Sequence, residues 1–341
     1  MSKLMTSVAV LQAVEQSKLD LDHDVRPMLP SLGQHGIITS FDDTTNTAAL
    51  SPDATPVTLR MLLSHTSGHE YDWFNPLLGK WRAARGEVPF SGATIEDKSA
   101  LPLVFQPGTG FAYGAGHDWA GKAVEVATGA SLEAFMRAHI WTPLVIDDAV
   151  SFYPQTRPGM AARMADMSSL SGEDGKPPAA DAPDFDILFG ATDCLGGGGV
   201  FASTAAYYAF VSAVFRRDPR LLSPASYEEL FRPQLDAARE QDLNDYFARS
   251  PVHTQFLALG IPHTVRKTWS FAGLVCLEGV EGRFAKGTTF WAGVPSVEWF
   301  MDHETGVCGT ALCQVLPPMH PEVIALHEAF QRVVFSMANG V

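Results

Sequence analysis

The 341-residue chain lacks the features that mark membrane, secreted and nucleic-acid-binding proteins. Its apolar runs fall short of the ~20 residues that a membrane-spanning helix needs. The apolar stretch at residues 8–11 is also too short for the core of a secretory signal. The net charge is −14 and the lysines and arginines form no cluster, so nucleic acid and anionic membrane surfaces are poor partners. These absences favour a soluble protein of the cytoplasm.

Cysteine is also scarce. The four cysteines are widely spaced and form no Cys-x-x-Cys pair, which favours buried free thiols over disulfides or metal ligands; they are Cys194, Cys276, Cys308 and Cys313. The apolar share of 46% and the charged share of 18% are ordinary for a globular protein and exclude a disordered chain. A chain of this length forms one large domain or two closely packed subdomains.

The first predicted helix has an unusual composition. Residues 2–17 are expected to be helical, with apolar side chains over most of the circumference. Such a helix is usually buried in the centre of a protein, whereas the first residues of a chain are usually exposed. We therefore expect that further sequence, now lost, once preceded this helix.

Capping residues set the limits of further helices. Thr58 is expected to cap a short helix at residues 59–64, and residues 73–85 form another. A helix at residues 118–128 is expected to end at Gly129, and Ser131 caps the next, whose apolar residues keep a helical period from 132 to 140. Residues 154–190 are rich in Pro, Gly, Asp and Ser, which predicts a long surface excursion able to border an active site.

The last third of the chain is rich in β-forming residues. Residues 269–280, 288–301 and 307–316 are separated by turn sequences at 281–283 and 303–306, which predicts an antiparallel meander. A final helix at residues 321–337 follows. Its apolar period places Val323, Leu326, Phe330 and Val334 on one face, which we expect to pack on the sheet.

Five segments, taken in order, resemble the serine β-lactamase and penicillin-binding-protein-like superfamily, in its class C and esterase branch, and within it the fungal transesterases of the lovastatin type. They are Ser-Lys-Leu-Met-Thr-Ser at 2–7, Leu-Leu-Ser-His-Thr-Ser-Gly at 62–68, Pro-Gly-Thr-Gly-Phe-Ala-Tyr-Gly at 107–114, Gly-Gly-Gly-Gly-Val-Phe at 196–201 and Trp-Ala-Gly-Val-Pro at 291–295. Each segment alone is a weak signal. Their order and spacing cover nearly the whole chain, which makes the resemblance specific.

The resemblance implies an α+β protein with a β-lactamase/transpeptidase-like fold. In that fold an antiparallel sheet is flanked by helices and joined to a helical subdomain; here we expect the N-terminal strands of the sheet to be missing. The whole chain, residues 1–341, would be a single domain. Within it, residues 20–265 would form the mainly helical subdomain, with the excursion at 154–190, and residues 1–19 and 266–341 the helix–sheet subdomain.

The resemblance also assigns roles to individual residues. Acyl transfer needs a nucleophile, a base and donors for the developing oxyanion. Lys3 corresponds to the base, and Tyr113 to the tyrosine that shares or relays its proton. Trp291 and Gly293 stand where relatives carry Lys-Thr-Gly or His-x-Gly beside the site, and the N–H of Val294 would be one oxyanion donor. Tryptophan in place of a cation favours neutral acyl groups over the carboxylates of β-lactams.

The nucleophile expected in a Ser-x-x-Lys motif falls one position before Met1. Relatives have a longer N-terminal region, so we expect the sequence to be truncated by a misassigned start or a lost exon. Two alternatives remain open. The chain is an inactive remnant, or Ser2 substitutes as a terminal residue whose own α-amine acts as base after removal of Met1. Ser2 cannot face Lys3 as the lost position would, because adjacent helical residues are about 100° apart.

Several functions therefore compete. The resemblance favours an acyltransferase that moves an acyl group from a thioester, such as one on a polyketide synthase carrier protein, to an alcohol of a secondary metabolite, without a cofactor. The rivals are an ester hydrolase with the same acyl-enzyme, and a binding-only pseudoenzyme. A metal-dependent hydrolase built on His65, His69, Glu70 and Asp72 is disfavoured by the turn-like sequence around them. The four-glycine run is expected to serve close backbone packing, since no Lys-Ser/Thr follows it.

Overall fold

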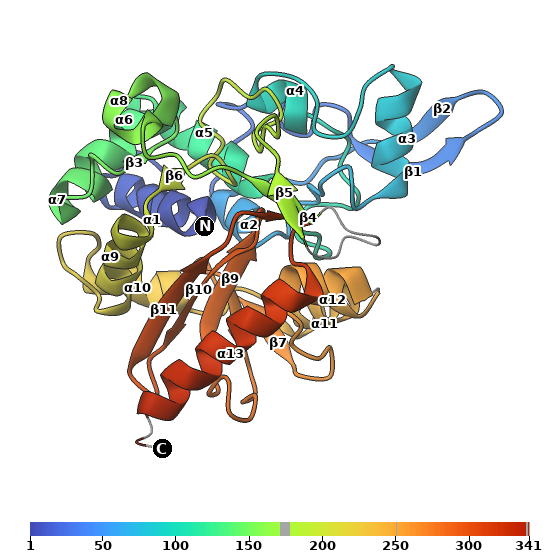
Figure 1. Ribbon diagram of the computed structural model, residues 1–341. Coiled ribbons are helices and arrows are strands. Elements are labelled where there is room, and N and C mark those ends of the chain that lie inside the picture. Colours follow the sequence, from blue (N-terminus) through green and yellow to red (C-terminus); the bar gives the residue numbers. More distant parts are fainter. Residues whose placement is uncertain (171–177, 250, 339, 341) are drawn as a thin grey trace.

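A computed structural model describes residues 1–170, 178–249, 251–338 and 340. Helix α1, Ser2–Glu15, has helices both above and below it, and its N-terminal end points toward the upper end of the large sheet (Figure 1). All twelve residues from Ser2 to Ala13 are buried, polar ones included. The prediction of a central helix is confirmed.

Short helices surround α1. Those that contact it are α5 (Gly116–Thr128), α6 (Leu132–Met136), the π-helix η1 (Arg137–Trp141) and α10 (Pro224–Phe231). Besides α13, described below, the other helices in the described part of the chain are α2 (Leu59–Leu63), α3 (Pro76–Ala84), α4 (Ile95–Ser99), α7 (Thr142–Leu144), η2 (Pro154–Thr156), α8 (Pro158–Ala161), α9 (Thr204–Phe215), α11 (Ala237–Ala248) and α12 (Pro251–Ala258). Among the described residues, no helix is both long and apolar enough to cross a membrane.

The predicted caps are largely confirmed. The Thr58 hydroxyl accepts from the N–H of Met61, Gly129 ends α5 in the left-handed region at φ 71°, and the Ser131 hydroxyl caps α6. The helix expected from residue 73 begins later. Asn75 caps it, and a proline holds its first position, because proline has no N–H to leave unpaired there. The helix expected from 132 to 140 passes into the π-helix at residue 137.

Five antiparallel strands form the large sheet, in the order β11-β10-β9-β8-β7. They are β7 (Lys267–Trp269), β8 (Leu274–Cys276), β9 (Thr289–Gly293), β10 (Val297–Asp302) and β11 (Val307–Leu312). The predicted meander is confirmed. The apolar run expected at 288–301 is in fact two strands, because a tight turn closed by the Ser296 N–H on the Gly293 carbonyl divides it.

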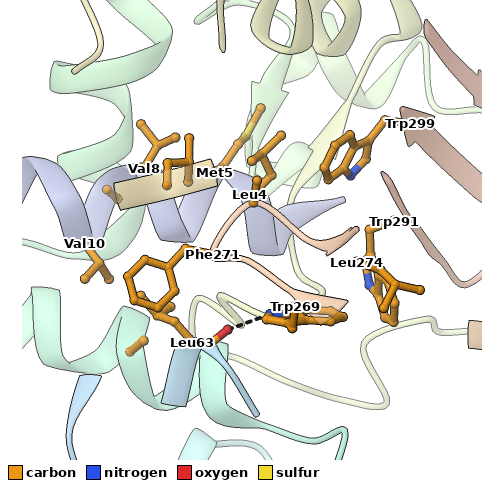
Figure 2. Packing of buried hydrophobic residues seen from close by; sticks show 14 of the residues in the cluster. Leu4, Met5, Val8, Val10, Leu63, Trp269, Phe271, Leu274, Trp291 and Trp299 are labelled. Carbon is orange, nitrogen blue, oxygen red and sulfur yellow. Dashed lines mark hydrogen bonds between the residues drawn. The ribbon is translucent and has the colours of Figure 1, made fainter. Parts of the chain in front are cut away.

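The two faces of the sheet carry different residues. Trp291 of β9 pairs with Trp299 of β10 on the face toward α1, and both belong to one buried cluster with Leu4 and Met5 (Figure 2). On this side Trp269 donates to the Leu63 carbonyl oxygen at 3.0 Å, the dashed line in Figure 2. The paired rings of Trp291 and Trp299, with the Trp269 ring 4.7 Å from that of Trp291, therefore form an aromatic floor beneath α1.

Helix α13, Pro321–Ala338, covers the opposite face of the sheet (Figure 1). The predicted helix is confirmed. Of the four residues predicted to face the sheet, Val323 is buried and Phe330 and Val334 are partly buried against the core, whereas the prediction is wrong for Leu326. Leu326 is 63% exposed, whereas the buried residues are Val323, Ile324, His327, Gln331 and Phe335. The sheet face beneath contains the buried carboxylate of Glu298, to which Gln331 donates at 2.8 Å. The buried face of α13 therefore contains a polar residue, Gln331, beside its apolar residues.

The excursion at residues 154–190 is more ordered than its composition suggests. Besides η2 and α8 it contains strands β4 (Ser168–Leu170) and β5 (Ala179–Asp181), and β4 pairs in parallel with β12 (Val315–Leu316). Part of the predicted excursion, residues 171–177, lies outside the described residues. Two further strand pairs were not predicted: β1 (Ile37–Asp42) with β2 (Thr47–Ser51), and β3 (Val150–Ser151) with β6 (Phe201–Ala202).

The four cysteines are free thiols, as predicted. Cys194 and Cys276 are buried. The expectation of burial is wrong for Cys308 and Cys313, which are only half-buried, because they lie on and just after the edge strand β11.

Candidate active site

Lys3 lies at the beginning of α1 and is 6% exposed. Its ammonium donates to the carbonyl oxygen of Gly197 at 2.8 Å. Asp118 binds the other side of the same peptide segment, since its carboxylate accepts from the Gly197 N–H at 2.7 Å. Burial raises the pKa of Asp118, while the positive charge of Lys3 opposes that rise. The two side chains are thus coupled through one glycine.

Two tyrosine rings lie next to the amine. The Lys3 Nζ is 4.9 Å from the ring centre of Tyr113 and 5.7 Å from that of Tyr71, which is within cation–π range. The two rings meet edge to face at 5.5 Å. Burial, and the negative charge of Asp118, raise the pKa of Tyr71 well above its usual range, so this phenol keeps its proton. The predicted pair, Lys3 and Tyr113, is brought together here.

The four-glycine run forms the floor beneath Lys3. A side chain on Gly196 would stand 2.5 Å from the His117 carbonyl oxygen, and one on Gly197 would stand 2.9 Å from the Asp118 carboxylate. The Gly196 carbonyl accepts from the Thr6 hydroxyl at 2.7 Å. These contacts support close backbone packing as the reason for glycine at these two positions.

Two buried histidines stand behind Tyr113. His65 lies 4.8 Å from the Tyr113 ring and 5.3 Å from His117, measured between ring centres. Burial lowers the pKa of both imidazoles well below the usual range, and the charge of Lys3 adds to the effect. They are therefore neutral at pH 7. The Nδ1 of His65 accepts from the Gly114 N–H at 3.3 Å, so its proton lies on Nε2.

Trp291 and Gly293 place the end of β9 at the site. The Trp291 ring is 5.1 Å from Tyr113 and 4.7 Å from Trp269, so it packs in the sheet and also faces the tyrosine. A side chain on Gly293 would stand 3.7 Å from the backbone nitrogen of Met1. Val294 follows and is 36% exposed. The beginning of α1 and the end of β9 therefore meet.

Other serines of the region have structural partners. Ser2 is buried, and its hydroxyl accepts from the Val200 N–H at 3.0 Å. Ser64 donates to the Arg60 carbonyl oxygen, and Ser67 lies 3.1 Å from the Nδ1 of His69. These contacts favour structural roles for all three.

The four residues considered as metal ligands belong to separate networks. Glu70 accepts from Asn75 and Tyr246, at 2.7 and 2.9 Å. Asp72 forms a buried ion pair with Arg82 at 2.8 Å. Within the part of the chain that the structure describes, no three histidine, cysteine or acidic residues are grouped so that they could hold a metal ion.

Sequence reasoning missed Tyr71 and the Gly197 carbonyl. Tyr71 follows the His-Thr-Ser-Gly turn in a loop without periodicity, so no spacing signal marks it. The sequence correctly predicts close packing for the glycine run. It does not show that the Gly197 carbonyl faces Lys3, because that depends on the position of α5. A backbone acceptor has no side-chain signature in a sequence.

The fold and this site together agree with a comparison to known families. The family model described as Beta-lactamase matches residues 1–333, and the chain belongs to that family. Two relatives show which members of the family this chain is similar to. The monacolin J acid methylbutanoyltransferase of Aspergillus terreus is 33% identical over 339 residues, which cover 98% of this chain and 80% of that protein. The lovastatin esterase of Penicillium rubens is 32% identical over 340 residues, covering 98% and 83%.

A solved structure agrees with these two relatives. The LovD6 mutant of simvastatin synthase (LovD) from Aspergillus terreus superposes with a TM-score of 0.89 at 32% identity, over 100% of this chain and 82% of that one. The resemblance to β-lactamase-like enzymes of the lovastatin type, inferred from five short segments, is confirmed. So is the β-lactamase/transpeptidase-like fold.

Proposed function

We propose that this chain is an acyltransferase that moves an acyl group from a thioester to an alcohol of a secondary metabolite such as a polyketide, through an acyl-enzyme. The observation that carries the proposal is the buried amine of Lys3 between the rings of Tyr113 and Tyr71. Relatives named as a methylbutanoyltransferase and as an esterase support the same acyl chemistry.

Lys3 acts as the base in this proposal. Its unprotonated amine takes the proton of a hydroxyl nucleophile, whose oxygen then bonds to the thioester carbonyl carbon, and the thiolate leaves as a thiol with that proton. In the second half an alcohol loses its proton to the same base and attacks the acyl-enzyme, which restores the hydroxyl. The Gly197 carbonyl fixes the position of Nζ. The Tyr113 ring centre lies 4.9 Å from Nζ, and its hydroxyl is the group assigned to relay the proton in this proposal.

The hydroxyl must stand on the helix face that carries Lys3. The position three residues before Lys3 satisfies this, because residues three apart share one face of a helix. That position adjoins the Met1 nitrogen, which lies beside Gly293. A serine there would place its hydroxyl between Lys3 and the end of β9. The N–H of Val294 is the proposed oxyanion donor, together with the N–H of that serine.

Trp291 sets the class of acyl group in this proposal. It is an apolar, 3% exposed wall beside Tyr113. By the resemblance described above, it stands where relatives carry a cation that binds a carboxylate. A neutral, apolar acyl chain fits such a wall better than an acidic one. We further propose that an acyl carrier protein can present the thioester, and that the protein acts in the cytoplasm, where its four free thiols stay reduced.

A direct experiment compares two forms of the protein, the chain as it stands and the chain with one serine placed before Met1. Each is incubated with the butyryl thioester of N-acetylcysteamine and with 2-naphthylmethanol as the alcohol. Naphthylmethyl butyrate as product supports the transferase. Butyric acid alone favours an ester hydrolase, the second candidate, which the 32% identity to an esterase supports.

The same experiment tests the inactive alternative. If the serine-bearing form is folded, and neither releases thiol nor becomes heavier by one butyryl group in an intact-mass measurement, the enzymatic proposal is wrong. Thiol release by the chain as it stands would instead require another nucleophile. Intact mass also shows whether Met1 is retained, which would eliminate a terminal Ser2.

A further inference from the structure

A buried lysine lies behind the aromatic residues that flank Tyr71. Lys98 of α4 is 1% exposed, and no acidic group pairs with it at salt-bridge distance among the described residues. Its ammonium instead donates to two backbone carbonyl oxygens, those of Phe90 and Phe189, each at 2.8 Å. The mechanism proposed above does not use this group. A buried ammonium that donates hydrogen bonds to two carbonyl oxygens far apart in the sequence requires an explanation.

Both carbonyls belong to phenylalanines in an unfavourable backbone conformation. Phe90 has φ 57° and Phe189 has φ 50°, in the left-handed region that aromatic residues rarely adopt. Such strain persists only where the surroundings hold it, and it gathers at functional sites. The Phe90 N–H is held as well, by the carboxylate of Asp72 at 2.9 Å.

The two strained residues complete one aromatic wall. Their rings meet edge to face at 5.9 Å, and the ring of Phe90 lies 4.9 Å from that of Trp73. Trp73 stacks on Tyr71 at 4.8 Å, and Tyr71 is the ring beside the Lys3 amine. The wall therefore runs without interruption from the proposed catalytic amine to the surface.

The outer part of the wall is open to solvent. Trp73 is 44% exposed and Phe189 is 47% exposed, which is high for two large apolar rings in contact with each other. Phe189 comes from the excursion, in a turn that Asp186 closes by accepting from the N–H groups of Leu188 and Gly190. Lys98 joins this turn to the body of the protein.

We propose that Lys98 is a positioning residue: it holds Phe90 and Phe189 in place so that their rings, with Trp73, form the surface that receives the apolar ring portion of the alcohol acceptor. The identity of this occupant rests on the proposed function and on the continuity of the wall with Lys3. Lys98 itself touches no substrate. It acts through the two carbonyls and through the Phe90 ring, whose centre lies 4.6 Å from the ammonium. An ammonium can donate to both carbonyls at once, and a neutral apolar side chain to neither.

Binding and hydrogen exchange test the proposal without any turnover. The Kd of 2-naphthylmethanol is measured by calorimetry, and amide exchange of residues 186–192 by mass spectrometry. We expect Lys98→Met to raise the Kd about tenfold, as misplaced binding groups do, and to speed the exchange of this turn about tenfold. Lys80→Met is the matched control, since Lys80 is 44% exposed and pairs with Asp43 on the surface; it should change neither.

Phe189→Gly separates the ring from the backbone. Glycine accepts the left-handed conformation and keeps the carbonyl for Lys98, so only the ring is lost. We expect Phe189→Gly to raise the Kd as much as Lys98→Met does. Lys98→Gln keeps two N–H donors, so its Kd should lie between those of wild type and Lys98→Met. Should Lys98→Met not fold, Lys98→Gln and Phe189→Gly decide the matter.

The proposal is overturned if wild type does not bind the naphthyl alcohol, if Phe189→Gly binds it as wild type does, or if the folded lysine variants keep the wild-type Kd and exchange. A purely structural lysine would lower the melting temperature and leave the Kd of the folded protein unchanged. Because neither readout needs catalysis, an inactive protein that shows these effects contradicts only the proposed function. An active protein that lacks them contradicts only the role of Lys98.

Discussion

Lys3 and Glu298 are both buried charged residues, and they lie on opposite sides of the same sheet. Lys3 is held by a carbonyl oxygen and two aromatic rings, above glycines that allow no side chain. Glu298 is 0% exposed, and its one hydrogen-bonded oxygen accepts from Gln331 of α13. The groups around the amine are thus mostly backbone or rings, whereas those around the carboxylate are flexible side chains.

This difference gives the two regions different sensitivities. The carboxylate faces His327 at 3.6 Å and the guanidinium of Arg283, which itself donates to Gln331. Burial raises the pKa of Glu298 to about 7, and Arg283 opposes the rise. The region under α13 therefore changes charge near neutral pH. The histidines around Lys3, His65 and His117, stay neutral in this pH range, so they do not change the electrostatic potential at the Lys3 amine.

The largest expected effect is that of Lys3→Met on acyl transfer. Loss of a general base costs about 10²–10⁴-fold in rate, and methionine keeps the apolar stem in place. The rate of thiol release is measured in whichever form of the protein turns over. Lys18→Met, at an exposed position just beyond α1, is the control and should keep the wild-type rate. A Lys3→Met protein with more than a tenth of that rate would remove Lys3 from the mechanism.

Next in size is the pH dependence caused by Glu298. When folding raises the pKa of a carboxyl group, the group stabilises the protein at pH values below its pKa in the unfolded chain. This stabilisation is lost as the pH rises through the pKa in the folded protein, here about 7. From pH 5 to 8 we expect the free energy of unfolding to fall by about 3 kcal/mol from this group, and Glu298→Gln to remove the fall.

Urea titrations at several pH values measure the effect of Glu298. His327 acts in the opposite direction, because burial lowers its pKa, so the comparison is made between wild type and variant at each pH. Glu322→Gln, at an exposed position of the same helix, is the control and should keep the wild-type slope. Equal slopes in wild type and Glu298→Gln would contradict the charge change under α13.

A smaller effect is expected from Gly196→Ala in the floor beneath Lys3. The added methyl group would stand 2.5 Å from the His117 carbonyl oxygen, and overpacking of this kind costs about 1–3 kcal/mol. Gly198→Ala is a matched control two residues away, where a side chain meets nothing within 4 Å. Thermal unfolding of the two variants compares them. If both were equally stable, the floor would not be rigid.

The smallest effect is expected on the outer face of α13. Leu326 is 63% exposed, so Leu326→Gln should change the free energy of unfolding by less than about 0.5 kcal/mol. Phe335 lies on the buried face and is 4% exposed, so Phe335→Ala should lower the free energy of unfolding by about 3 kcal/mol or more. A large loss of stability in Leu326→Gln would show that Leu326 packs on the sheet, as the sequence period predicts.

Much of the fold could be predicted because its signals are local. An all-round apolar helix is recognisable in residues 2–17, and turn residues separate the strands of the meander. The burial of Gln331 on α13 could not be predicted, because it depends on Glu298, a polar residue inside a strand that only the assembled sheet places under the helix. Sequence period records apolarity but not which polar groups must be paired.

The site divides in the same way. Lys3, Tyr113 and Trp291 carry side chains that a motif can mark, and they lie together in the structure. Gly197 acts through its carbonyl and Lys98 through the carbonyls of other residues. Both roles arise from contacts between distant parts of the chain, which no spacing within one segment reveals.

The position of α1 has a consequence for how the protein is made. This helix leaves the ribosome well before β9, the strand that meets its beginning and is synthesised much later. Until then the beginning of the helix lacks its final cover, and exposed apolar surface on an incomplete chain favours association with other chains. Production of this protein should therefore depend on chaperones that shelter a nascent chain until its last third has emerged.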